Sequence, residues 1–186
     1  RSNNSYTDLG SEGNAAGLMV ERWAFASILN SIIVSEQTPA VTVGNHDTGG
    51  SAELTIGYSL ISDGQDSIGV YEDGTLIWGP GNIDVDPRFV DEENDDYHLL
   101  ASSQLINAGH PDSTDSDGTV ADIGAYPHLN SYSGPTWYIS ESGNDTTATG
   151  ASTDPFRSIQ AGINFSSSGD SVTVAEGTYV ENINFR

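Results

Sequence analysis

The stretch that decides the fold is Phe25–Ile33, FASILNSII, which recurs 28 residues later as Glu53–Ile61, ELTIGYSLI. In both copies apolar residues alternate with small or polar ones, a pattern typical of short, half-buried β-strands. Such a unit cannot bury its apolar side alone. Stacking the copies places Ile32 over Leu60 and lets backbone hydrogen bonds run from one copy to the next. The repeat therefore predicts an all-β solenoid.

A second class of strand keeps a similar rhythm, at residues 16–20, 40–43 and 67–71. Turn-forming residues separate the strands, for example at 44–50 and 62–64. Each repeat is thus expected to supply two or three short strands. A β-sandwich of hairpins is the alternative, but it gives no reason for the two copies to match at this offset.

The composition agrees with thin stacked layers. Of the 186 residues 35% are hydrophobic, which is low for one central core, and there is no Cys to form disulfides or thiolate metal sites. No apolar run approaches the roughly 20 residues that a membrane helix needs, so no membrane insertion is expected.

The chain is strongly acidic. Five basic residues, all Arg, stand against 27 acidic ones, and the formal charge is −22. Because nucleic acids and anionic membranes bind cationic surfaces, neither is an expected partner. Divalent cations would be attracted. The alternative is that the charge serves solubility alone.

Residues 75–126 change in character. A last strand at 75–78 is followed by a segment in which Pro87 excludes a central strand, and then by short motifs at 97–99, 106–109, 117–119 and 122–126. Over residues 28–126 this order resembles the C-terminal end of secreted bacterial proteins of the pectin-lyase-like repeat family. The resemblance implies a right-handed parallel β-helix and an extracellular or cell-surface location.

A second passage of strand and helix signals then begins. After a polar linker at 127–136 come a strand at 137–140, an amphipathic helix near 156–165 and a strand at 171–174. This passage resembles the N-terminal cap and first turn of the same family, with the helix covering an open end. The expected organisation is the closing turns of one β-helix (1–126), a linker (127–136) and the opening of another (137–186), within a longer protein.

No catalytic constellation is recognised, so the chain is not expected to be an enzyme. Polysaccharide lyases that resemble this fold use bound calcium and a basic residue, whereas Lys is absent here and no Arg lies in the repeated strands beside clustered acids. Asp95 and Asp96 are interpreted as turn or ion-binding residues. The four His residues are interpreted as solvated loop residues: His46, His98, His110 and His128.

An acidic loop surrounds Gly118 and is the candidate metal site. Calcium takes about 6–8 oxygen ligands, and four carboxylates crowd this loop: Asp112, Asp115, Asp117 and Asp122. The spacing does not fit an EF-hand. The alternative is a turn in which the Asp side chains bind the backbone.

Four aromatic residues are candidates for ligand binding, since flat rings stack on the faces of sugars: Trp23, Tyr58, Tyr71 and Trp78. The alternative is that they are partly buried ladder residues. The preferred function is a structural or adhesive segment that associates with further copies end to end. The other reading is a carbohydrate-binding or polysaccharide-processing module whose active turns lie outside this chain.

Overall fold

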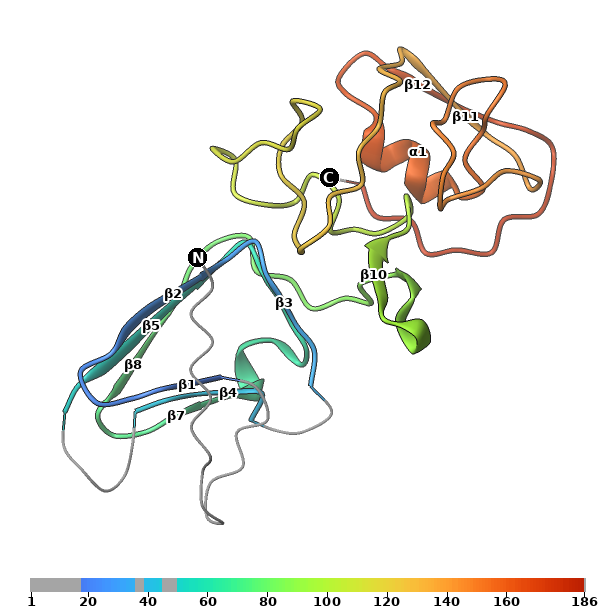
Figure 1. The fold of residues 1–186 in the computed structure, drawn as a ribbon. Helices are drawn as coiled ribbons and strands as arrows, with labels where there is room; N and C mark the ends of the chain where they lie inside the picture. The colour runs from blue at the N-terminus through green and yellow to red at the C-terminus, as the bar shows by residue number, and fades with distance from the viewer. Residues whose placement is uncertain (1–17, 36–38, 45–49, 186) are drawn as a thin grey trace.

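The computed structural model describes residues 18–35, 39–44 and 50–185, and its N-terminal part consists of short strands on a path that the chain follows three times (Figure 1). The first passage contains β1 (Leu18–Val20), β2 (Phe25–Leu29) and β3 (Ile32–Ile33). The second contains β4 (Val41–Val43), β5 (Ala52–Gly57) and β6 (Leu60–Ile61). The third contains the 3₁₀ helix η1 (Gly64–Ser67), β7 (Ile68–Val70), β8 (Gly74–Trp78) and a bridge from Ile83 to Leu60.

Each of the first two passages adds one strand to each of three parallel stacks, and the third adds β7, β8 and the bridge at Ile83. The strand orders of the stacks are β1-β4-β7, β2-β5-β8 and β3-β6, and the stacks form the sides of a triangle in Figure 1. Phe25 lies opposite Glu53 and Ile32 opposite Leu60, which confirms the register predicted from the 28-residue repeat. Parallel pairing excludes the hairpin sandwich for this region. The arrangement is consistent with the predicted β-helix.

The core of this part lies inside the triangle. Alternate residues of the strands point inward, and the innermost are completely buried: Val41, Val43, Leu54, Ile56 and Ile61. Each such side chain stabilises the fold by roughly 1.5–3 kcal/mol relative to an exposed position. The modest hydrophobic content is therefore concentrated where the stacks face one another.

The corner before the third stack is built alike in each passage. One residue of each corner has a left-handed backbone conformation with positive φ. These residues are Asn30 (φ 49°), Tyr58 (φ 47°) and Gly81 (φ 73°). Polar side chains then link the layers. The N–H of Ser31 donates to Ser59 Oγ, at 3.2 Å, and the N–H of Ser59 donates to Asn82 Oδ1, at 3.2 Å. These bonds hold successive passages in one register.

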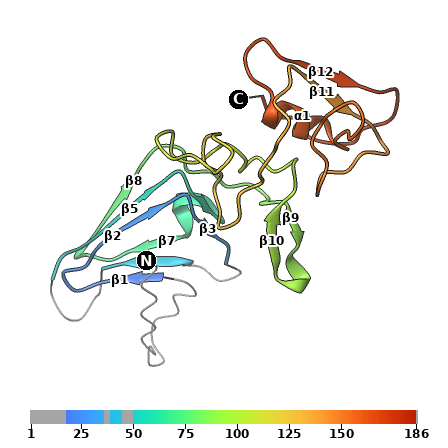
Figure 2. The ribbon, with the colours of Figure 1, turned by 45° about the horizontal axis from the view of Figure 1, so that its top comes forward.

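An antiparallel hairpin follows the stacks and projects from the molecule (Figure 2). It comprises β9 (Phe89–Asp91), the 3₁₀ helix η2 (Glu92–Asn94) and β10 (Asp96–Leu99). Residues 100–126 then form loops around a separate core that includes Leu60: Leu99, Leu105, Ile106 and Ile123. The N–H of Gly124 donates to the carbonyl of Asn30, at 3.0 Å, which ties these loops to the stacks.

The C-terminal part pairs β11 (Thr136–Ile139) in parallel with β12 (Ser171–Val174), beside helix α1 (Ile159–Phe165). Ser158 caps α1, because its Oγ accepts from the N–H of Ala161, at 3.3 Å. The helix is shorter than the predicted 156–165. Phe156 belongs to a strand bridge with Ile139, because its N–H donates to the carbonyl of Tyr138, at 3.0 Å.

The two parts pack against each other through the end of α1. The side-chain amide of Asn164 donates to the carbonyls of Ala101, at 2.9 Å, and Ser103, at 2.7 Å. Phe165 contacts the core of each part. The segment predicted as a linker is also packed, since the ring of His128 lies 5.5 Å from that of Phe165. No helix in the described ranges is long and apolar enough to span a membrane.

Candidate ligand-binding site

The four aromatic residues predicted to bind a ligand lie at the two ends of the β2-β5-β8 sheet. Trp23 and Tyr71 precede strands of this sheet, whereas Tyr58 follows β5 and Trp78 ends β8. Trp23 is 71% exposed, but the others are half-buried, and Trp78 packs against the core. The four rings therefore do not form one platform.

The carboxylates of the acidic loop bind backbone N–H groups. Those of Asn107 and His128 each donate to the buried carboxylate of Asp122, at 2.7 Å. Asp115 accepts from the N–H of Asp122, at 3.0 Å, and Asp117 accepts from that of Thr119, at 3.1 Å. The fourth residue, Asp112, is exposed. Three of the four thus stabilise the loop in the way that the turn interpretation expects.

No group of three or more His, Asp or Glu side chains among the described residues is arranged to hold a metal ion. The carboxylates of this loop nevertheless influence one another's charge. Burial raises the pKa of Asp122 to about 6, and the charges of Asp115 and Asp117 add to the shift, while the two backbone N–H bonds oppose it. The prediction of calcium therefore rests on the sequence alone.

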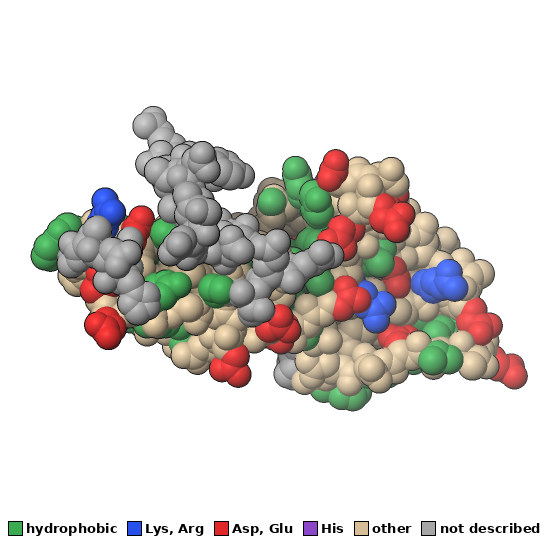
Figure 3. Space-filling model, turned by 90° about the horizontal axis from the view of Figure 1, so that it is seen from below, with side chains coloured by type: hydrophobic (Ala, Val, Ile, Leu, Met, Phe, Trp, Pro, Cys, Tyr) green, Lys and Arg blue, Asp and Glu red, His purple; other side chains and the backbone are tan. Residues whose placement is uncertain are grey.

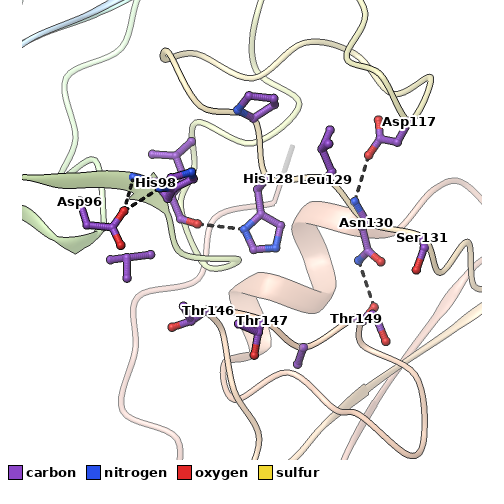
Figure 4. A pocket seen from close by; sticks show the side chains of 14 residues that line it. Asp96, His98, Asp117, His128, Leu129, Asn130, Ser131, Thr146, Thr147 and Thr149 are labelled. Atoms are coloured by element: carbon purple, nitrogen blue, oxygen red, sulfur yellow. Dashed lines mark hydrogen bonds and ion pairs between the residues drawn. The ribbon is translucent and has the colours of Figure 1, made fainter.

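A polar hollow of about 450 Å³ lies between β10, the loop at 127–131 and the loop at 146–149 (Figure 4). Asn130 joins its walls. Its backbone N–H donates to Asp117 Oδ2, at 3.0 Å, and its side-chain amide donates to the carbonyl of Thr149, at 3.0 Å. Other polar side chains of the lining are Asp96, His98, His128, Ser131, Thr146 and Thr147.

Both histidines of this hollow are fixed through Nδ1. His98 Nδ1 lies 2.6 Å from Asp96 Oδ1, and its ring stacks on Tyr126 at 4.6 Å. His128 Nδ1 donates to the carbonyl of Leu99, at 2.9 Å. Because Nδ1 carries the proton in these bonds, Nε2 is the ring nitrogen left to meet a ligand. Hydrogen bonds from His98 hold the pKa of Asp96 below its usual value.

The lining determines what this hollow is suited to bind. Imidazole, amide, hydroxyl and carboxylate groups line it together with apolar side chains such as Val90 and Leu129, and the polar groups offer both donors and acceptors. An imidazole oriented by a carboxylate also has the arrangement of a general base. The polar part of this lining is suited to hydrogen bonding with a small ligand that carries several hydroxyl groups.

Sequence reasoning missed this hollow. The sequence indicates solvated loop positions for His98 and His128. His98 is indeed exposed, but it lies on a strand, and His128 is half-buried beside Phe165. They are 30 positions apart in the sequence and share no periodic pattern. His110 packs edge-to-face against Tyr58, at 4.9 Å, and His46 lies outside the described residues.

Comparison with known protein families gives a match to part of the chain. Residues 141–185 match a family described as a protein of unknown function, DUF1565, which is associated with parallel β-helix proteins. The matched stretch contains α1 and β12. No curated protein and no solved structure matches the chain. The match supports a relation to β-helix proteins over this short stretch.

Proposed function

We propose that the chain is an extracellular structural or adhesive segment of a right-handed parallel β-helix, which joins like segments end to end. The observation that carries the proposal is the set of three parallel stacks held in one register. Among the described residues, β1 and β2 lie at one outer edge and β7 and β8 at the other. Such edges are templates for further strands.

The C-terminal part supports the same proposal. Among the described residues β12 pairs with β11 alone. Apolar side chains around and beyond it are exposed, including Val174 (41%), Val180 (94%) and Phe185 (78%). A further turn of a β-helix stacked on this edge would remove these side chains from water, which is favourable in proportion to the area covered.

Sedimentation velocity over a wide range of protein concentration tests end-to-end association. Figure 3 shows acidic side chains spread over one face, and a formal charge of −22 opposes association at low salt. We therefore expect oligomers to grow with concentration and with salt, because salt screens this repulsion. Val180→Lys should weaken association, whereas Leu129→Lys, the same change of charge at an exposed position that lines the polar hollow, should not. A monomer under all conditions would contradict the proposal.

A second candidate function is carbohydrate binding, and the polar hollow around His98 and Asn130 favours it. Sugars present hydroxyl groups that donate and accept hydrogen bonds, which matches the mixed lining. A titration of the chain with soluble glycans, followed by NMR, tests this function. Asn130→Ala removes the side-chain amide that joins two walls and is expected to weaken binding at this site.

A further inference from the structure

The β9–β10 hairpin borders a second hollow, of about 760 Å³, and this one is rich in aromatic side chains. Neighbouring residues of a strand point to opposite faces, so Tyr97 turns away from the polar hollow that His98 lines. Phe89 and Tyr126 complete the aromatic lining, and Asn30 and Glu92 add polar groups. We propose that this hollow binds a neutral glycan. The inference deepens carbohydrate binding, the second candidate function above, and rests on it.

Two half-exposed rings supply the stacking surface. Tyr97 is 42% exposed and Tyr126 is 48% exposed. Phe89 meets Tyr97 edge-to-face, with the ring centroids 5.2 Å apart, and His98 stacks on Tyr126 at 4.6 Å. These contacts fix both rings while leaving part of each open to a ligand. Rings held in this way bind the apolar face of a sugar with little loss of side-chain entropy.

Polar groups beside the rings match the hydroxyl groups of a sugar. The hydroxyl of Tyr97 donates to Asp95 Oδ1, at 3.1 Å, and this bond, with the charges of Asp95 and Glu92, raises the pKa of Tyr97. The phenol therefore stays neutral and keeps its lone pairs for a donor. Glu92 offers a carboxylate, which makes strong hydrogen bonds with hydroxyl donors.

The charge of the hollow selects among glycans. Glu92 is the charged residue of its described lining, in which there is no Arg, Lys or His. The whole chain carries a formal charge of −22. A uronate or sulfated glycan would bring further negative charge to a site with no cation to pair it, which is costly. A neutral glycan pays no such electrostatic cost.

Calorimetric titration of the full chain tests the proposal. The probes are hexasaccharides of glucose, mannose and xylose, with hexagalacturonate as the acidic counterpart. We expect at least one neutral probe to bind and hexagalacturonate not to bind. Tyr97→Ala and Tyr126→Ala should each weaken binding by about tenfold or more, as removal of a stacking ring does. Tyr97→Phe keeps the ring and loses only the phenolic oxygen, so it should bind more weakly than the native chain but more tightly than Tyr97→Ala.

Matched variants separate this site from its alternatives. Phe25→Ala removes an exposed ring elsewhere, on β2, and should leave binding unchanged. Circular dichroism checks that each variant is folded. If Asn130→Ala abolishes binding while both Tyr→Ala variants bind normally, carbohydrate binding stands and this site is refuted. Binding of hexagalacturonate alone, or of no probe at all, also refutes it.

Discussion

Among single residues, Asp122 is the one whose titration is most informative. Its pKa is raised from 3.8 to about 6 because the carboxyl group is buried, although two backbone N–H groups donate to it. A raised pKa means that the folded chain binds the proton more tightly than the unfolded chain. The stability linked to this proton is therefore complete below about pH 4 and is lost as the pH rises through 6.

Titration of Asp122 tests this assignment. We expect a carboxyl carbon with an apparent pKa near 6 in NMR spectra and its disappearance in Asp122→Asn. The native chain should lose roughly 3 kcal/mol of stability between pH 4 and pH 7 relative to that variant, the equivalent of about two pKa units. An Asp122 pKa below about 4.5 would contradict the geometry of the loop.

The sequence predicts the partner of a residue correctly where a local repeat determines the strand register. Ile32 stacks on Leu60 because both copies of the repeat keep the same alternation and the same left-handed corner before it. Prediction failed for Tyr97, His98 and Tyr126. These residues come into contact only because the β9–β10 hairpin packs against a loop that is distant in the sequence, and no local sequence pattern indicates that contact.

Among the elements, β5 is the central strand of its stack and should contribute most to stability. Leu54 is completely buried between β2 and β8. We expect Leu54→Ala to lower the free energy of unfolding by about 2–5 kcal/mol, through lost burial and the cavity left behind. The neighbour Thr55 points to the other face, so Thr55→Ala should cost much less. Denaturation by urea measures both, and equal effects would contradict the inward alternation.

Some strands and helix boundaries could be predicted from the sequence and others could not. The parallel strands followed from the repeat, and α1 followed from apolar spacing, but the start of the helix was placed three residues early. Phe156 fits the helical spacing with Ile159 and Ile163, yet its backbone pairs with β11. The β9–β10 hairpin was not predicted, because its strands are short and acidic residues fill its tip.

For the whole molecule, the balance of 27 acidic and five basic residues makes calcium the ion to test. If the loop of Asp112, Asp115, Asp117 and Asp122 binds calcium, the bound ion stabilises the folded chain by mass action. We expect a chelator to lower the melting temperature by about 2–4 °C for each 1 kcal/mol of lost stabilisation in a chain of this size. Asp112→Asn should reduce the response. An unchanged midpoint would contradict calcium binding.

The central proposal is that parallel turns stack within the chain and between copies. Electron micrographs of the full chain at high concentration and moderate salt test it most directly. The account predicts rods that lengthen with concentration and have a layer spacing of about 4.8 Å along the rod, the distance between hydrogen-bonded strands. Separate compact particles at every concentration, with no axial layer spacing, would contradict it.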